Sequence, residues 1–221
     1  MKPRFVQAQH VAVKICGITT ASDALMACEA GADAVGFNFW AGSKRFIEPE
    51  NLAQWVGDLP DSIERVGVFV NADAEEVFPL LETGLINAVQ FHGNENPAYY
   101  RQFSSGFACL KAFTVKDEYS LTEISRFTAA TILLDAYCPG EYGGSGTCFE
   151  WDLGRRFVND NPDRRVVLAG GLRPDNVSAA VSEVLPAAVD VASGVEAAPG
   201  IKDGSMINDF VQAVHEINIP D

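Results

Sequence analysis

Long apolar runs, positive charge and paired cysteines are all scarce in this sequence of 221 residues. No stretch approaches the roughly 18 apolar residues of a membrane-spanning helix, and residues 1–13 lack the apolar core of a secretory signal. Lys and Arg total 16 against 30 Asp and Glu, so the net charge is −14. Because duplex binding depends on neutralising phosphates with Lys and Arg, we expect neither a nucleic-acid nor a membrane partner.

The cysteines and histidines show no pattern typical of a metal site. The five cysteines include no CxxC pair, and their odd number argues against a disulfide framework. A reducing compartment fits such cysteines best, so we expect the protein to be cytoplasmic. His10, His92 and His215 are widely separated and form no HxH or HExxH motif. The sequence therefore predicts no bound metal.

Short apolar, β-branched runs alternate along the chain with longer segments typical of helices. The eight runs begin at Val11, Ala32, Glu64, Ile86, Phe107, Thr131, Arg165 and Ala188. Their starts are about 20 to 35 residues apart, which is the length of one strand followed by one helix. Eight such units predict an α/β protein with a single-domain (β/α)8 TIM barrel.

An open doubly wound sheet is the alternative architecture. It is less favoured because eight units give no obvious switch point and no GxGxxG motif follows the first strand. We expect residues 1–10 to form an N-terminal extension and residues 11–221 to form the barrel. The extension is either an ordinary lead-in or a cover for the bottom of the barrel.

In such a barrel the active site lies at the carboxyl ends of the strands. Strand alternation turns Val13 toward the helices and directs Lys14 and Cys16 into the barrel. The same parity directs Asp135 inward at the end of its strand. Cys16 and Asp135 therefore form a candidate base and acid pair for proton transfer. The alternatives are an inert buried cysteine and an aspartate used in an ion pair or a cap.

Other polar residues near strand ends have simpler interpretations. Lys14 could contact an anionic substrate, but pairing with a core carboxylate such as Asp190 is favoured. His92 is interpreted as a structural histidine whose hydrogen bonds are satisfied. Arg45 is a natural partner for a carboxylate, although from the residues alone a solvated surface arginine is favoured.

Glycines after the last two predicted strands point to a phosphate. Gly171 follows the seventh strand, and Ser193 and Gly194 follow the eighth. Backbone N–H groups at these two loops commonly hold phosphate in this barrel, and glycine permits a close approach. The alternative is that both sites are only tight turns. The YGGSG segment at residues 142–146 could close over a ligand.

Several motifs, in order, resemble phosphoribosylanthranilate isomerase, an enzyme family of tryptophan biosynthesis. They cover nearly the whole chain after the short N-terminal extension. The motifs are VKICGIT at residues 13–19, GADAVGFNF at 31–39, SKRFI at 43–47, VGVFVN at 66–71, VQFHGNE at 89–95, LLDAY at 133–137, GGSGTCFEW at 143–151, LAGGLRPDNV at 168–177 and VDVASGVEAAPGIKDGSMINDFV at 189–211.

The resemblance implies a cofactor-independent aldose–ketose isomerase. The expected reaction is the Amadori rearrangement of N-(5-phosphoribosyl)anthranilate to 1-(2-carboxyphenylamino)-1-deoxyribulose 5-phosphate. It implies Cys16 as general base, Asp135 as general acid and Arg45 as the ligand of the anthranilate carboxylate. The phosphate would bind at Gly171 and at the turn of Ser193 and Gly194. No metal or organic cofactor is expected, because the substrate supplies its own imine.

Two other functions are considered. One is a related phosphosugar barrel, such as a pentose-phosphate epimerase or the aminoaldose isomerase of histidine biosynthesis. The former often uses metal-binding histidines, and the latter typically uses two aspartates where this chain has Cys16 and Asp135. The other is a non-catalytic barrel that keeps a phosphate-binding site. Acceptance of a second aminoaldose, and the choice between monomer and homodimer, stay open at this level.

Overall fold

In the computed structural model, which describes residues 1–136 and 151–217, eight parallel strands form a closed barrel in the order β1 to β8. The strands are β1 (Ala12–Cys16), β2 (Ala34–Asn38), β3 (Glu64–Phe69), β4 (Ala88–Phe91), β5 (Ala108–Val115), β6 (Thr131–Ala136), β7 (Arg165–Ala169) and β8 (Ala188–Val191). Strand β8 closes on β1 with Asp190 opposite Lys14. The predicted (β/α)8 class is confirmed, and the open sheet is excluded.

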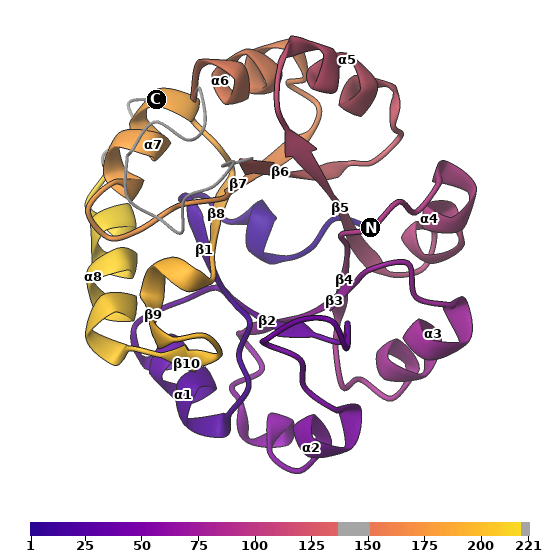
Figure 1. Ribbon diagram of the computed structural model, residues 1–221, viewed down its shortest axis with the longest axis vertical. Coiled ribbons are helices and arrows are strands. Elements are labelled where there is room, and N and C mark those ends of the chain that lie inside the picture. The colour runs from indigo at the N-terminus through magenta and orange to yellow at the C-terminus, as the bar shows by residue number, and fades with distance from the viewer. Residues whose placement is uncertain (137–150, 218–221) are drawn as a thin grey trace.

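Helices form the outer ring of the barrel, as Figure 1 shows. Within the described ranges they are α1 (Ala21–Glu29), α2 (Pro49–Ala53), α3 (Ala74–Glu82), α4 (Pro97–Ser104), α5 (Glu118–Arg126), α6 (Trp151–Asp160), α7 (Val177–Val184) and α8 (Gly204–His215), with a single 3-10 turn, η2 (Val56–Asp58), after α2. Helix α3 continues through Pro79, and Thr83 at its end donates both its N–H and its hydroxyl to the Pro79 carbonyl, at 3.0 and 2.7 Å. None of the described helices is long and apolar enough to cross a membrane.

Alternate strand residues face opposite sides of the barrel wall, as the sequence predicted. Val13 of β1 lies in the outer core between strands and helices. Ala12 of β1 and Leu133 of β6 lie in a separate core inside the barrel. The same alternation directs Cys16 and Asp135 toward the inside, at the carboxyl ends of their strands.

The N-terminal segment closes the bottom of the barrel. One turn of 3-10 helix, η1 (Phe5–Gln7), places Phe5 and Val6 inside the ring of strands, where Figure 1 shows it in indigo. Small side chains make room for it: Ala12, Ala34, Ala88, Ala108 and Ala188. Glu64 accepts from the Phe5 N–H at 2.7 Å, and Arg165 Nε donates to the Val6 carbonyl at 2.6 Å. This segment therefore covers the barrel bottom, while the domain boundary at residue 10 stays a prediction.

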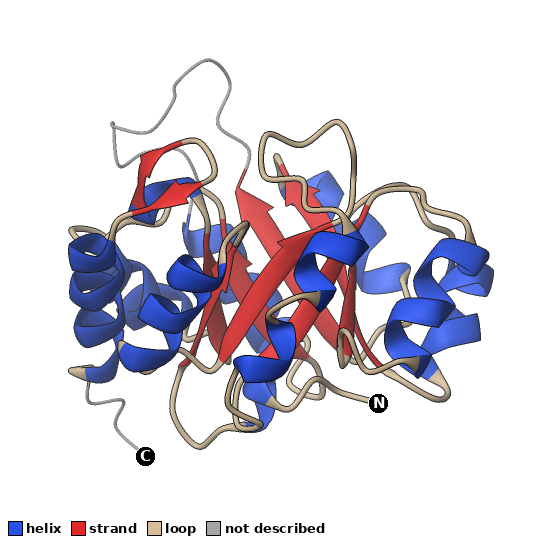
Figure 2. Ribbon diagram, turned by 90° about the horizontal axis from the view of Figure 1, so that it is seen from below, coloured by secondary structure: helices blue, strands red, loops and turns tan. Residues whose placement is uncertain are grey.

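Between β8 and α8 the chain inserts elements that the strand pattern did not predict. A 3-10 turn, η3 (Ser193–Val195), leads into an antiparallel hairpin of β9 (Glu196–Ala198) and β10 (Ile201–Lys202). Gly200 turns this hairpin with a φ of +81°. Figure 2 shows the hairpin standing above the carboxyl ends of the barrel strands. It thus brings two charged residues, Glu196 and Lys202, to the rim.

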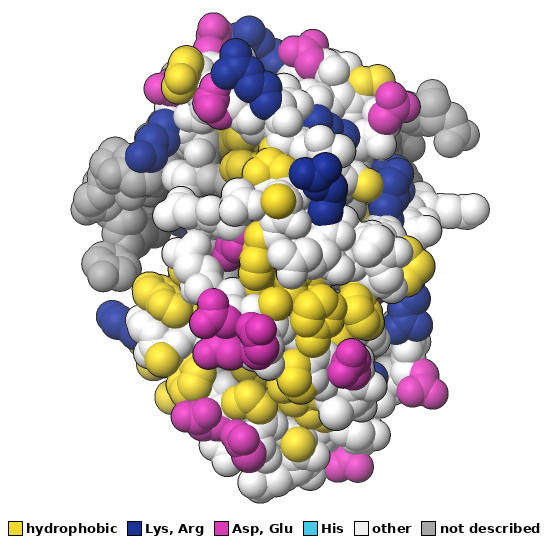
Figure 3. Space-filling view, turned by 90° about the vertical axis from the view of Figure 1, so that its right-hand side faces the viewer, with side chains coloured by type: hydrophobic (Ala, Val, Ile, Leu, Met, Phe, Trp, Pro, Cys, Tyr) yellow, Lys and Arg dark blue, Asp and Glu magenta, His cyan; other side chains and the backbone are white. Residues whose placement is uncertain are grey.

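The outer surface carries much of the negative charge. Figure 3 shows Asp and Glu side chains spread over the face that holds α3 and α4, with apolar side chains between them. A chain with a net charge of −14 repels small anions at long range. Any anionic ligand must therefore be attracted by positive groups gathered locally, and the rim of the barrel supplies them.

Candidate active site

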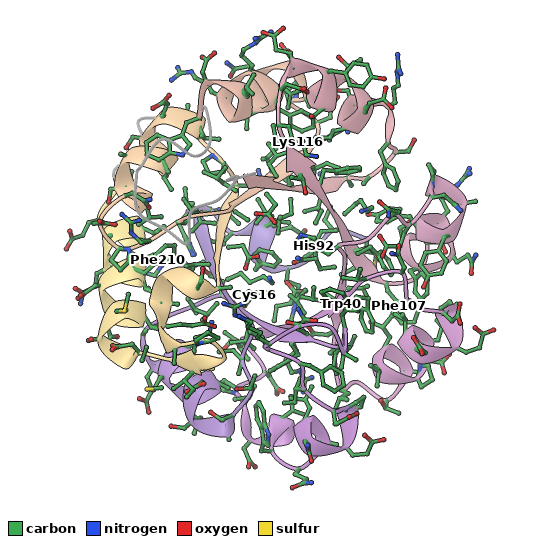
Figure 4. The ribbon with its side chains drawn as sticks, in the orientation of Figure 1. Cys16, Trp40, His92, Phe107, Lys116 and Phe210 are labelled. Carbon is green, nitrogen blue, oxygen red and sulfur yellow. The ribbon has the colours of Figure 1, made fainter. Side chains whose placement is uncertain are left out.

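A cavity of about 250 Å³ opens at the carboxyl ends of the barrel strands. Each residue predicted for catalysis or substrate binding lines this cavity: Cys16, Arg45, Asp135, Gly171, Ser193 and Gly194. Gln90, His92 and Asp190 line it as well. In Figure 4, which looks down the barrel, Cys16 and His92 lie inside the ring of strands. The fold therefore brings the predicted residues from five separate segments into one site.

Cys16 ends β1 with its thiol packed against the neighbouring strand. A Cβ atom added to Gly36 of β2 would lie 2.8 Å from the Cys16 Sγ and 3.1 Å from the Lys14 Nζ. Only a glycine leaves room for both groups at this position. Burial raises the pKa of the Cys16 thiol, and the negative charge of Asp190 adds to the rise, while Lys14 opposes it. In the free protein at neutral pH the thiol is therefore mostly protonated.

Lys14 and Asp190 form a buried ion pair, of which Asp190 lines the cavity. Lys14 is fully buried, and its Nζ donates to Asp190 Oδ1 at 2.8 Å, as predicted. Burial alone would lower the pKa of Lys14, but the charge of Asp190 and its hydrogen bond outweigh that effect and raise it. The lysine is therefore protonated, so a fixed positive charge lies next to the Cys16 thiol and favours its ionised form.

Asp135 of β6 and His92, which follows β4, meet in the cavity. His92 Nε2 lies 3.2 Å from Asp135 Oδ2. The buried Gln90 places its amide nitrogen 2.9 Å from His92 Nδ1. In the tautomer in which Nδ1 accepts from that amide, Nε2 carries a proton and donates to Asp135. The interpretation of His92 as a structural histidine misses this contact, because it joins two strands that are not neighbours in the barrel.

Arg45, in the loop after β2, is held by a carboxylate of the protein. Its Nε and Nη2 lie 2.6 Å from Oε1 and Oε2 of Glu196 on β9. Lys202 of β10 also donates to Glu196 Oε1, at 2.9 Å, and to the carbonyl of Ala192. Hydrogen bonds with Glu196 raise the pKa of Arg45. The two cations outnumber the one carboxylate, so the cluster keeps a net positive charge beside the cavity.

The glycine turns after β7 and β8 lie against each other at the rim. Gly171 has a φ of +66°, a conformation that favours glycine. A Cβ atom at Gly194 would come within 1.9 Å of the Leu172 carbonyl oxygen. The two turns are therefore packed backbone to backbone, so that neither is an isolated tight turn. Together they present backbone groups to the cavity, as a phosphate-binding site requires.

A second hollow, of about 560 Å³, adjoins the first and shares Arg45, Gly171, Ser193 and Gly194 with it. Lys44 and Arg173 also line this hollow. Arg173 in turn holds Asp175 with its Nε and Nη2, at 3.0 and 2.9 Å. These cations provide the local attraction for an anion that the charge of the whole chain opposes.

Some site residues could not be found from the sequence pattern. Glu196 and Lys202 lie on a hairpin that had not been predicted, and only their place in the VEAAPGIKDG motif singles them out. The predicted closing segment at residues 142–146 lies outside the described residues, as do Cys138 and Cys148. The described cysteines other than Cys16 do not line the cavity.

Comparison with known proteins gives the family. The sequence profile of N-(5'-phosphoribosyl)anthranilate isomerase matches residues 13–213. The N-(5'-phosphoribosyl)anthranilate isomerase of Magnetococcus marinus is 45% identical over 204 residues, which are 92% of this chain and 95% of that protein.

Solved structures agree with the sequence match. The phosphoribosyl anthranilate isomerase of Thermotoga maritima superposes with a TM-score of 0.87 at 41% identity, covering 94% of this chain and 100% of that one. A phosphoribosyl anthranilate isomerase in complex with reduced 1-(o-carboxyphenylamino)-1-deoxyribulose 5-phosphate superposes with a TM-score of 0.83 at 39% identity, with the same coverage. The protein therefore belongs to the phosphoribosylanthranilate isomerase family.

Proposed function

We propose that this protein catalyses the Amadori rearrangement of N-(5-phosphoribosyl)anthranilate in tryptophan biosynthesis, with Cys16 as general base and Asp135 as general acid. One observation carries the assignment of roles. The thiol and the carboxyl group line one cavity whose rim holds both the paired glycine turns and Arg45. A substrate with a phosphate at one end and a carboxylate at the other matches this arrangement of groups.

The first step opens the sugar ring. Asp135 gives a proton to the furanose ring oxygen as the bond between C1 and that oxygen breaks. The nitrogen lone pair forms the C1=N bond, so the product is a protonated Schiff base. His92, whose Nε2 lies 3.2 Å from Asp135 Oδ2, can stabilise the carboxylate that remains.

The second step moves a proton from carbon. Cys16, as thiolate, takes the proton from C2, and the electron pair forms a C1=C2 bond while the nitrogen becomes neutral. The resulting enolamine loses the proton of its C2 hydroxyl and gains one at C1, which gives the ketone. A proton then passes from Cys16 to Asp135 through solvent, and both groups are restored. The positive charge of Lys14 favours the thiolate, and the imine acts as the electron sink that a cofactor would otherwise supply.

Substrate binding uses both ends of the cavity. Gly171, Ser193 and Gly194 would hold the phosphate through their backbone N–H groups. A guanidinium group has five N–H donors, and the contacts of Arg45 with Glu196 engage Nε and Nη2. The edge formed by Nη1 and the second N–H of Nη2 can therefore receive the anthranilate carboxylate in a bidentate contact.

A coupled fluorescence assay tests the proposal. Anthranilate and phosphoribosyl pyrophosphate generate the unstable substrate with a separate phosphoribosyltransferase, and the loss of its fluorescence is followed after this protein is added. We expect rapid loss in the presence of a chelator. Cys16→Ala and Asp135→Asn should each lower kcat by about 10²- to 10⁴-fold, the usual contribution of a general acid or base.

Matched controls separate chemistry from folding. Cys28→Ala removes a thiol outside the cavity, and Asp58→Asn removes an exposed carboxylate of η2, so both should keep normal rates. Normal turnover in folded Cys16→Ala or Asp135→Asn would remove that residue from the mechanism. If the unaltered protein binds a phosphosugar but gives no turnover, it is a binding barrel. The aminoaldose of histidine biosynthesis would then be tested as substrate.

We also propose that the enzyme works in the cytoplasm as a monomer or homodimer. Cys16, Cys28 and Cys109 are free thiols, which suits a reducing compartment. Sedimentation velocity of the purified chain over a range of concentrations distinguishes the two states of association.

A further inference from the structure

Two of the three histidines meet at the bottom of the barrel, the face opposite the active-site cavity. His10 lies just before β1, Asp33 directly before β2, and His215 is the last residue of α8. One ligand atom from each side chain lies within 4.8 Å of the other two. We propose that these three residues bind a divalent transition-metal ion of the Zn²⁺ class.

The distances suit such an ion. His10 Nε2 lies 3.0 Å from Asp33 Oδ1. Two metal bonds of about 2.0 to 2.1 Å at a tetrahedral angle separate their ligand atoms by about 3.3 Å. An ion can therefore replace the proton between these two atoms with a shift of a few tenths of an ångström. The exposed His215 ring stands edge-on to His10, with a centroid distance of 5.6 Å, and needs a side-chain rotation to complete the site.

A backbone contact holds the carboxylate in place. Asp33 Oδ2 accepts from the Val13 N–H at 2.8 Å, which fixes the carboxylate and turns Oδ1 toward His10. Such support of a ligand by an outer hydrogen bond is typical of metal sites. A Cβ atom added to Gly31 would lie 3.6 Å from the His215 Cε1, so the turn before Asp33 lies beside that ring.

The charge of the surroundings favours a cation. Asp33 supplies one negative charge, and the carboxyl end of α8, where His215 lies, carries the negative end of the helix dipole. Two imidazoles and one carboxylate, with water in the fourth position, form a donor set typical of Zn²⁺ or Co²⁺ and unlike the oxygen sets of Mg²⁺ or Ca²⁺. The sequence predicted no metal because these residues are brought together only by closure of the barrel.

A metal here would tie three parts of the chain together. His10 ends the N-terminal segment whose Phe5 lies inside the barrel, Asp33 directly precedes β2, and His215 ends the last described helix. The expected consequence is a more stable barrel, because an ion that binds the folded state and not the unfolded chain raises stability. Cys16 lies six residues after His10, about 20 Å along the strand direction, so the site is separate from catalysis.

Titration with Zn²⁺ and Co²⁺ tests the proposal. The full chain is stripped with a chelator and titrated with Zn²⁺ in a calorimeter, where we expect one equivalent to bind. Bound Co²⁺ should give visible d–d absorption without the sulfur-to-cobalt charge-transfer band that a thiolate such as Cys16 would produce. Zn²⁺ should also raise the midpoint of thermal unfolding.

Single substitutions identify the ligands. His10→Ala and His215→Ala are changes at exposed positions, and each should weaken Zn²⁺ binding at least about ten-fold, since loss of an outer-sphere partner alone often costs that much. Gln212→Ala, an exposed change on the same helix as His215, is the matched control and should bind Zn²⁺ normally.

Three results would overturn the proposal. One is the absence of Zn²⁺ binding in the unaltered chain at concentrations well above those of the protein. Another is equal affinity in the unaltered chain and in the His10→Ala/His215→Ala double variant. A Co²⁺ spectrum dominated by sulfur charge transfer would also reject it and would place the metal on the thiols.

Discussion

Both carboxylate oxygens of Glu196 accept hydrogen bonds from Arg45, at 2.6 Å. The arginine that we propose binds the substrate carboxylate is therefore already oriented by a carboxylate of the protein. The side chain of Glu196 is only 4% exposed, whereas that of Arg45 is 25% exposed. The buried partner therefore fixes the geometry of the guanidinium group, which keeps its outer edge toward solvent and cavity.

We predict that Glu196→Gln raises KM more than it lowers kcat. The neutral amide accepts a weaker hydrogen bond and can no longer hold both Nε and Nη2 of Arg45, so the anchoring edge loses its orientation. A hydrogen bond to a charged group is worth about 1.5 to 3 kcal/mol, which corresponds to a rise in KM of about ten-fold or more. Steady-state kinetics measure KM and kcat, and the exposed Glu50→Gln serves as the control. A fall in kcat at constant KM would assign Glu196 to the chemistry instead.

The same residue should make stability depend on pH. Burial raises the pKa of Glu196, but hydrogen bonds with Arg45 and Lys202 outweigh it and lower the pKa below 4.5. A lowered folded-state pKa gives stability that is fully present above pH 4.5 and is lost as pH falls through the folded value. Urea unfolding should therefore show the parent more stable than Glu196→Gln at about pH 7, with the difference shrinking toward about pH 3. A gap that stays constant with pH would contradict this.

The pH profile of Asp135→Asn should isolate the thiol. Because burial raises the pKa of Cys16, its thiolate fraction grows about ten-fold per pH unit across the neutral range. In the Asp135→Asn variant the residual kcat/KM should rise with that slope. A flat profile in the variant would exclude Cys16 as the base.

The buried ion pair of Lys14 and Asp190 gives a prediction about two substitutions. Lys14→Met leaves Asp190 buried without its partner and should cost about 3 to 5 kcal/mol of unfolding free energy. Adding Asp190→Leu should recover most of that loss, because an apolar pair can replace a buried ion pair at little cost. Chemical denaturation measures both. An additive double variant would mean that the two residues do not interact in the way the structure shows.

The glycine turns can be compared by substitution with alanine. Gly194→Ala should destabilise the protein more than Gly171→Ala, because its Cβ atom would overlap the Leu172 carbonyl oxygen at 1.9 Å, whereas that of Gly171 meets nothing within 4 Å. For Gly171 the cost is that of a positive φ, about 1 kcal/mol. Gly84→Ala, with a φ of +73° and open space, is the control for backbone strain alone. Equal losses at all three positions would contradict the packing of the two turns.

Strand periodicity explains why so much of the fold could be predicted. The alternation along β1 is a local property, and it predicted that Lys14 and Cys16 point inward. The favoured pairing of Lys14 with Asp190 is confirmed. Strand ends meet at one rim in a parallel barrel, so the same reasoning brought Cys16, Asp135 and the glycine turns together. Arg45 followed only from the family resemblance, because from the residues alone a solvated surface arginine was favoured, whereas the structure places it at the cavity.

Contacts that depend on closure of the barrel could not be predicted in that way. His92 touches Asp135 only because β4 and β6 curve toward a common axis. The strands of the β9–β10 hairpin are too short to show the alternation of apolar and polar residues that marks a strand. Glu196, the counter-ion of Arg45, was therefore not predicted. Nothing in the spacing of His10 and His215 relates the first strand to the last helix.

The β9–β10 hairpin separates two properties that evolution can alter independently. It contributes Glu196 and Lys202, the partners that set the charge around Arg45, yet it pairs with no strand of the barrel. The thiol and the carboxyl group stand on β1 and β6, inside the ladder. Exchange of the hairpin alone should therefore change the charged groups around Arg45, while Cys16 and Asp135 keep the positions that the barrel gives them.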